Sequence, residues 1–180
     1  MKRFIPIVIS ILAVSAVAFA QDDPIEKALL AAPPQLKEGA TVVKWKSDFT
    51  YDTLKKGTNR LVCFDRTGQP GQQPFAVECT SIANLDRVAE NLKYEAMGDK
   101  ATVQAALEAA DKAGTRVKPE FGSLWIHMSG PDSAHARKHV TVAVPGATAQ
   151  SLGLPDNPKQ GGIWIMNAGT STAHLMTPGQ

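Results

Sequence analysis

Residues 81–114 read SIANLDRVAENLKYEAMGDKATVQAALEAADKAG, and this stretch contains two helical patterns in succession. In both patterns the apolar residues recur every three or four positions, as on one face of a helix: Ile82, Leu85, Val88, Ala89 and Leu92, then Val103, Ala106, Leu107 and Ala110. Ser81 and Asp99 are suited to cap the two helices, and Gly98 and Gly114 to end them. The stretch therefore predicts two amphipathic helices in the middle of the chain.

Short apolar or alternating runs lie on both sides of these helices and indicate β-strands. The expected strands cover residues 41–46, 60–64, 75–80, 124–129, 139–144, 163–167 and 173–177. Connections rich in Gly and Pro separate them, as is typical of turns and loops. Strands followed by helices and then by more strands predict an α+β fold, with a mostly antiparallel sheet of about seven strands and two central amphipathic helices.

Residues 21–40 predict a short helix and a proline-rich lead-in to this fold. The expected helix covers residues 22–32, with Asp23 as its N-cap, and two consecutive prolines follow it. We expect residues 41–180 to form a single α+β domain, since a chain of this length has enough apolar residues for one core.

Residues 1–20 predict a signal peptide. Lys2 and Arg3 precede an apolar run over residues 5–19, and the small residues AFA lead to a cleavage point after Ala20. The run is shorter than the roughly 20 apolar residues that a bilayer span needs. These features predict an exported bacterial protein, periplasmic or secreted, with no stable membrane span after cleavage.

Removal of the signal peptide changes the charge balance of the chain. Loss of Lys2 and Arg3 from the 19 basic residues leaves 17, which equals the 17 acidic residues. A chain without excess positive charge has little electrostatic attraction for nucleic acid or for an anionic membrane surface. We therefore expect no nucleic-acid partner.

The chain has two cysteines, Cys63 and Cys79. An even number of cysteines in an exported protein favours a disulfide. A redox or metal-binding pair is the alternative, but the Cys-x-x-Cys spacing typical of such pairs is missing. The cysteines fall on two expected strands joined by a loop, so a bond between them requires only that these strands pair.

Two segments of the C-terminal third resemble one another. Residues 122–135 read GSLWIHMSGPDSAH and residues 161–174 read GGIWIMNAGTSTAH, with six identities in fourteen positions. Side chains alternate between the faces of a strand, so Trp125 and His127 are expected on one face and Ile126 on the other. The repeat predicts two similar hairpins, each reaching a histidine, although a chance similarity remains the alternative.

All the histidines lie in this third, and they are the metal-ligand candidates: His127, His135, His139 and His174. Imidazole suits copper or zinc. The spacing of these residues follows no zinc pattern, and exposed loop histidines are the alternative. A metal site requires at least three of them to converge.

Three hypotheses for the function follow. The first is a non-catalytic binding module for a small molecule, an envelope component or a protein, with ligand-binding candidates Trp125, Trp164, His127, His135 and His174. The second is a periplasmic copper or zinc metalloprotein that uses the histidines. The third is a small hydrolase that pairs Ser171 or Asp132 with a histidine. The segment GTSTA at residues 169–173 resembles the nucleophile segment of subtilisin-like serine proteases, but the chain lacks that family's His-Gly-Thr segment.

Overall fold

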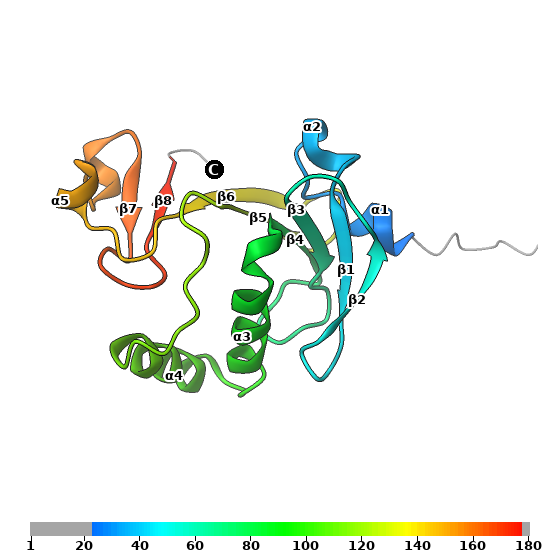
Figure 1. Ribbon diagram of the computed structural model, residues 1–180, viewed down its shortest axis with the longest axis horizontal. Coiled ribbons are helices and arrows are strands. Elements are labelled where there is room, and N and C mark those ends of the chain that lie inside the picture. The colour runs from blue at the N-terminus through cyan, green and yellow to red at the C-terminus, as the bar shows by residue number, and fades with distance from the viewer. Residues whose placement is uncertain (1–22, 178–180) are drawn as a thin grey trace, which may run out of the picture.

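The computed structural model describes residues 23–177 and contains one mixed sheet of eight strands, in the order β2-β1-β3-β4-β5-β6-β8-β7 (Figure 1). The strands are β1 Thr41–Trp45, β2 Tyr51–Lys55, β3 Leu61–Asp65, β4 Phe75–Ser81, β5 Leu124–Gly130, β6 Arg137–Ala143, β7 Trp164–Met166 and β8 His174–Met176. The sheet and its helices form the α+β fold expected from the sequence. The predicted signal peptide, residues 1–20, lies outside the described residues.

The eighth strand arises because the chain reverses between β1 and β2. None of the expected strands covers residues 51–55, and β2 there brings the expected number of about seven to eight. The Lys46 N–H donates to the Thr50 carbonyl, and Phe49 has a φ of 65°. This tight turn allows β2 to pair antiparallel with β1, while β3 pairs parallel with the other edge of β1.

The two predicted central helices are present between β4 and β5. A short 3-10 turn, Ile82–Asn84, follows the Ser81 cap, and α3 then covers Leu85–Glu95. Asp99 caps α4, Lys100–Lys112, by accepting from two backbone N–H groups. Helix α3 packs its apolar face on the sheet, whereas the only buried residue of α4 is Ala110. Because α4 turns away (Figure 1), α3 alone covers this face, and part of β5 and β6 stays free of a helix.

The N-terminal segment packs on the opposite face of the sheet. Helix α1, Pro24–Ala28, begins at the Asp23 cap as expected but ends before residue 32, and α2, Pro34–Lys37, begins at the second of the two prolines. A proline suits the first turn of a helix because it lacks only an N–H that would have no partner there. The second proline therefore starts α2, whereas α1 has already ended at Ala28.

The disulfide between Cys63 and Cys79 is confirmed. The two residues lie directly opposite each other on the antiparallel strands β3 and β4, with their Cα atoms 4.1 Å apart. Both side chains are fully buried on the sheet face that α1 covers, next to Val42 and Ile126. The bond thus joins neighbouring strands inside the core.

The C-terminal region adds two hairpins, β5–β6 and β7–β8, which lie side by side because β6 pairs antiparallel with β8. The segment between β6 and β7 contains α5, Ala149–Leu152, and a 3-10 turn, Pro158–Gln160. A small apolar cluster around Val144, Ile165 and Ala173 holds the second hairpin together. None of the helices within residues 23–177 is long and apolar enough to cross a membrane.

Gly57 is required where the chain crosses from β2 over the start of β1 to reach β3. A Cβ at this position would come closer to the backbone of Gly39, Ala40 and Thr41 than van der Waals contact allows. We expect Gly57→Ala to lower the free energy of unfolding by about 2 kcal/mol, because rigid backbone must shift. That equals a fall in Tm of roughly 4–8 °C for a chain of this size, measurable by differential scanning calorimetry.

Gly68→Ala is the control for this prediction. Gly68 has a positive φ, but nothing lies within 4 Å of its Cβ position. The control therefore introduces only the strain of a side chain at positive φ, at a cost of about 1 kcal/mol. Equal losses for the two variants would show that the crossing is not sterically tight.

Candidate functional site

The two similar segments form the first strand and the turn of the two C-terminal hairpins, but their terminal histidines do not meet. His135 lies in the β5–β6 turn, before Arg137 begins β6, whereas His174 pairs with Ala143 at the other end of that strand. The six residue steps between Arg137 and Ala143 span roughly 20 Å of strand. The two terminal histidines therefore do not form two halves of one site.

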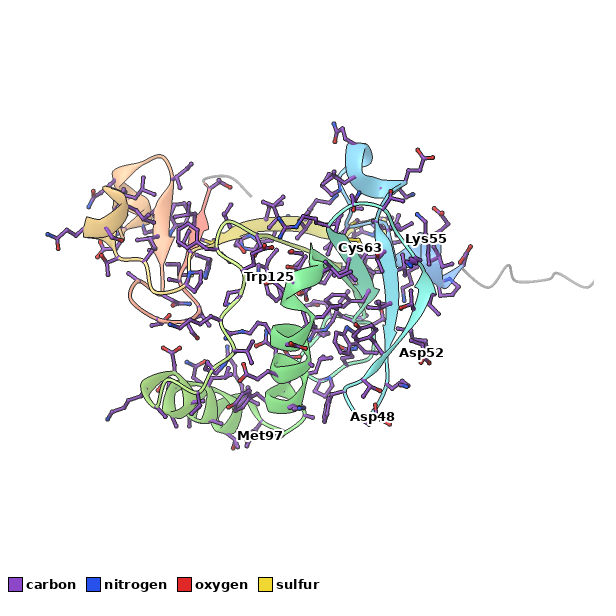
Figure 2. All side chains as sticks on the ribbon, in the orientation of Figure 1. Asp48, Asp52, Lys55, Cys63, Met97 and Trp125 are labelled. Carbon is purple, nitrogen blue, oxygen red and sulfur yellow. A yellow bond between two sulfur atoms is a disulfide. The ribbon has the colours of Figure 1, made fainter. Side chains whose placement is uncertain are left out.

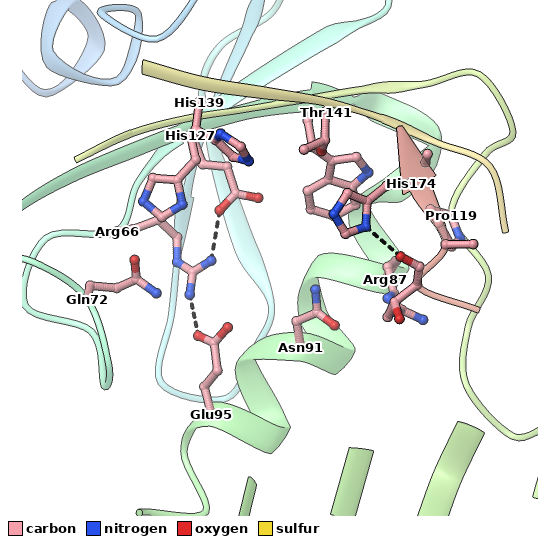
Figure 3. Close-up of a pocket in the computed structure, with 15 residues that line it drawn as sticks. Arg66, Gln72, Arg87, Asn91, Glu95, Pro119, His127, His139, Thr141 and His174 are labelled. Carbon is pink, nitrogen blue, oxygen red and sulfur yellow. Dashed lines mark hydrogen bonds and ion pairs between the residues drawn. The ribbon is translucent and has the colours of Figure 1, made fainter. Parts of the chain in front are cut away.

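A cavity of about 360 Å³ lies between α3, the uncovered part of the sheet and the segment that leads from α4 to β5 (Figure 3). Trp125, which lines it, is labelled in Figure 2. Three strands and β8 supply the residues on the sheet side: Glu78, Trp125, His127, His139, Thr141, Ala143 and His174. Helix α3 supplies the opposite side: Arg87, Asn91 and Glu95. This cavity brings together three of the histidines of the chain and Trp125.

A row of three polar side chains crosses the sheet at one end of this cavity. Glu78 on β4 lies opposite His127 on β5, which lies opposite His139 on β6. Directly opposed residues of antiparallel strands have Cβ atoms about 4.5–5.5 Å apart. Burial, the charge of Arg66 and the nearby His139 together hold the pKa of His127 below its ordinary value. Its Nε2 is enclosed and has no hydrogen-bond partner among residues 23–177.

Arg66 connects this row to α3. Its guanidinium donates to Glu78 at 2.9 Å from Nη1 and to Glu95 from Nη2, and only 4% of the residue is exposed. Burial raises the pKa of Glu78 and of Glu95, while the ion pairs with Arg66 act against this shift. One arginine is therefore shared by two carboxylates, and this end of the cavity has an excess of acidic groups.

The other end of the cavity contains Arg87 and His174, with Asn91 between the two ends (Figure 3). Arg87 is buried, and desolvation followed by repulsion from Arg116 lowers its pKa to about 10, so it remains charged at neutral pH. His174 places Nδ1 2.7 Å from the carbonyl oxygen of Thr172. Because a carbonyl only accepts, Nδ1 bears the proton, and the Nε2 of a neutral His174 is an acceptor.

The structure groups some of the predicted site residues and separates others. Trp125, His127, His139 and His174 line the cavity, but Trp164 lies on the edge strand β7, outside its lining. His135 is exposed, and its Nδ1 lies 2.8 Å from Oδ1 of Asp132. His135 and Trp164 thus remain ligand-binding predictions without a place in this cavity.

The histidine positions also bear on the metal hypothesis. His127 and His139 are paired across strands, but no group of three or more His, Cys, Asp or Glu side chains within residues 23–177 is placed to hold a metal ion. Copper or zinc binding stays a prediction.

For the hydrolase hypothesis, Ser171 is buried, and its Oγ lies 3.4 Å from Nη1 of Arg87. The recorded hydrogen bonds of Ser171 go to Arg87 and Asp111, and Asp132 contacts His135 on the surface. Neither arrangement places a nucleophile against a base that a third group orients. Hydrolysis stays a prediction as well.

Sequence reasoning missed the charged residues that complete the cavity. Glu78 is a charged residue within the fully buried strand FAVECTS, and Arg87 is buried on α3 beside the apolar face that contains Leu85 and Val88. A charged residue in an apolar pattern is rarely fully buried unless it is paired, so both interruptions were usable signals. Arg66, the partner of Glu78, and Glu95, the second partner of Arg66, lie elsewhere in the sequence and gave no such signal.

Comparison of the chain with protein-family models, with curated proteins and with solved structures gave no match in any of the three cases. The function is therefore argued from the cavity alone.

His127 provides a pH-dependent test of the geometry. Its pKa is lowered in the folded state, so the unfolded chain binds more protons there and the contribution of His127 to stability falls as pH decreases below about 6.5. We expect the wild type to lose more stability than His127→Gln between pH 7.5 and pH 5.5, because the glutamine cannot be protonated. The measurement is urea unfolding at both pH values.

The nearby Glu78 and Glu95 are present in both the wild type and His127→Gln. Their contribution to the pH dependence of stability is therefore common to the two proteins. His135→Gln is the control, because His135 is exposed and lies outside the cavity. An identical pH dependence for the wild type and His127→Gln would contradict the prediction.

Proposed function

We propose that this chain is an exported, non-catalytic binding protein that holds a small molecule in the cavity beneath α3. The observation that supports this proposal is the convergence of Trp125, three histidines and the desolvated charged groups Arg66, Glu78 and Arg87 on one cavity. Concave sites with apolar walls, a few convergent polar groups and shifted pKa values are the usual locations of ligand sites.

The walls of the cavity combine the two kinds of surface that a small ligand needs. Trp125, Pro119, Ala143 and Ala173 supply apolar contacts. The ion pairs of Arg66 fix the polar side chains before any ligand arrives, and preorganised groups lower the cost of binding. The volume of about 360 Å³ is within the range of small-molecule sites.

Export to the periplasm or beyond belongs to the same proposal. It rests on the signal-peptide pattern of residues 1–20 and on the disulfide, a bond that forms and persists in oxidising compartments. Among the described residues that line the cavity, no nucleophile lies in contact with a base. This favours ligand binding over catalytic turnover.

The experiment is a thermal-shift and calorimetric screen of the mature chain against small molecules of contrasting chemistry, namely aromatic carboxylates, aromatic amines, sugars and inorganic phosphate. Thr141→Phe is the test variant, because Thr141 lines the cavity opposite Trp125 and a phenyl ring there occupies the ligand volume. His135→Ala is the matched control outside the cavity. We expect at least one class to raise the Tm of the wild type and the control, and not of Thr141→Phe.

Two results would count against the proposal. One is a screen in which no compound stabilises the wild type. The other is a compound that stabilises Thr141→Phe as much as the wild type, since it would then bind elsewhere.

A further inference from the structure

We propose, building on the proposed binding function, that the ligand is a small aromatic carboxylate whose carboxylate group is held by Arg87 and Asn91. The proposal rests on hydrogen-bond donors that the fold leaves free at one end of the cavity, and on the distribution of charge between its two ends.

Arg87 has donors to spare. Within residues 23–177 its hydrogen bonds, to the Val117 carbonyl and to Ser171, both leave from Nη1. Nε and Nη2 of Arg87 form no hydrogen bond within these residues. They are also not fully enclosed, because the enclosed side-chain polar atoms without a partner in this part of the chain are Trp45 Nε1 and His127 Nε2. Arg87 lines the cavity, and the proposal places these free donors against the ligand there. Nε and Nη2 together form the edge of a guanidinium that matches a carboxylate bidentately.

The acidic neighbour of Arg87 does not occupy these donors. Glu90 is 3.7 Å from Nη1 of Arg87, while its own oxygens accept from Arg116 Nε at 3.0 Å and from the Val117 N–H at 3.2 Å. Glu90 and Asp111 together offset the positive charges of Arg87 and Arg116, and Glu90 does so without satisfying Nε or Nη2. This arrangement suits a monoanion better than a dianion such as phosphate.

Asn91 is held with its donor free. Its Oδ1 accepts from Nη2 of Arg116 at 2.7 Å, and this contact fixes the orientation of the side-chain amide. The NH₂ group then points away from Arg116, and Figure 3 shows Asn91 directed from α3 into the cavity. Arg87 and Asn91 are four residues apart on α3, a spacing that places both on one helix face.

The opposite end of the cavity determines the orientation of the ligand. Glu78 and Glu95 share Arg66, so negative charge is in excess there and repels a carboxylate. Trp125 and Thr141 lie between the two ends and provide an apolar wall against which a flat ring can pack. The carboxylate is therefore directed to Arg87 and the ring to Trp125.

The test compares Asn91→Asp with the wild type by isothermal titration calorimetry. The carboxylate introduced by this change retains an acceptor for Arg116 and so preserves the packing of α3, but it replaces the free donor with a negative charge. Gln150→Glu, on the exposed surface of α5, is the matched control for the same change of net charge. The probes are benzoate, 2-naphthoate and indole-3-acetate, with benzylamine and inorganic phosphate as charge controls.

We expect at least one of the three carboxylates to bind the wild type, and Asn91→Asp to weaken that binding at least about tenfold, the cost of losing one charge-assisted hydrogen bond. Gln150→Glu should leave it unchanged, and phosphate should not compete. Arg87→Lys should also weaken binding, because a lysine keeps the charge and loses the bidentate edge.

Binding of benzylamine in place of the carboxylates, or equal carboxylate affinity in Asn91→Asp, would overturn this inference while leaving the proposed binding function intact. Failure of every probe, together with a negative result in the wider screen, would overturn both.

Discussion

We expect Arg66→Met to be less stable than the wild type by about 3–5 kcal/mol at neutral pH, the range for removing one partner of a buried ion pair. Glu78 is 5% exposed, and its recorded hydrogen bond is the one from Arg66. Without the guanidinium, Glu78 must either stay charged in a desolvated position or take up a proton. Urea unfolding measured at pH 7 gives the loss directly.

The pH dependence of this variant identifies the cause. Burial already raises the pKa of Glu78, and removal of Arg66 takes away the attraction that opposes this shift. A raised pKa in the folded state adds stability at low pH that is lost as pH rises. Arg66→Met should therefore recover part of its stability when the pH is lowered from 8 to 5.

The double variant Arg66→Met, Glu78→Met is the control. Replacement of both partners by apolar side chains is often close to neutral, since no uncompensated charge remains. Glu95, the second partner of Arg66, is partly exposed and can be solvated by water. A double variant as unstable as the single one would show that the loss comes from packing and not from the buried charge.

Removal of the disulfide should have the second-largest effect, a loss of about 3 kcal/mol in the double variant Cys63→Ala, Cys79→Ala. The bond closes a loop of 16 residues, and the chain-entropy estimate for such a loop is about 3 kcal/mol. For a chain of this size the corresponding fall in Tm is roughly 6–12 °C. Thermal unfolding followed by circular dichroism measures it.

Reduction of the wild type separates the cross-link from the side chains. The reduced protein keeps both sulfur atoms in the core next to Val42 and Ile126, so it lacks only the covalent bond. We expect reduced wild type to lose most of the stability that the alanine variant loses. If reduction leaves the Tm unchanged, the paired strands alone hold this part of the sheet together.

Glu78 and Cys79, which these two predictions address, lie on opposite faces of the same strand, β4. Glu78 faces α3 and the cavity, and its neighbour Cys79 faces α1. Alternation of side chains along β4 therefore places the disulfide in one apolar layer and the buried ion pair in the other. A loss of stability at one face should add to a loss at the other, because the two groups share no partner.

Much of the fold could be predicted because its signals are local. The apolar spacing of residues 85–92 identified α3, and Asp99 identified the start of α4. Alternation predicted opposite faces for Ile126 and His127, as observed. Each signal depends on residues close together in the sequence, because the geometry of a helix or strand fixes which nearby side chains share a face.

The errors in the expected fold occurred where local signals compete or end. No strand was expected at residues 51–55, because the turn that starts β2 depends on a positive φ at Phe49, a residue with no marked preference for turns. The proline pair was interpreted only as a stop, although Pro34 also starts α2. The sequence also did not indicate that α4 leaves most of its surface exposed, because the tertiary arrangement decides which helix packs on the sheet.

By itself the sequence determined the α+β class, the central helices and the opposite faces of the strand containing Trp125, and it favoured the bond between Cys63 and Cys79 that the structure shows. Only the tertiary structure decided that His127, His139 and His174 share a cavity while His135 does not, and that Arg66 joins Glu78 to Glu95. The reason is physical. Periodicity fixes the direction of a side chain relative to its own strand or helix, whereas a site depends on the register between strands, and that register is set by contacts between residues far apart in the chain.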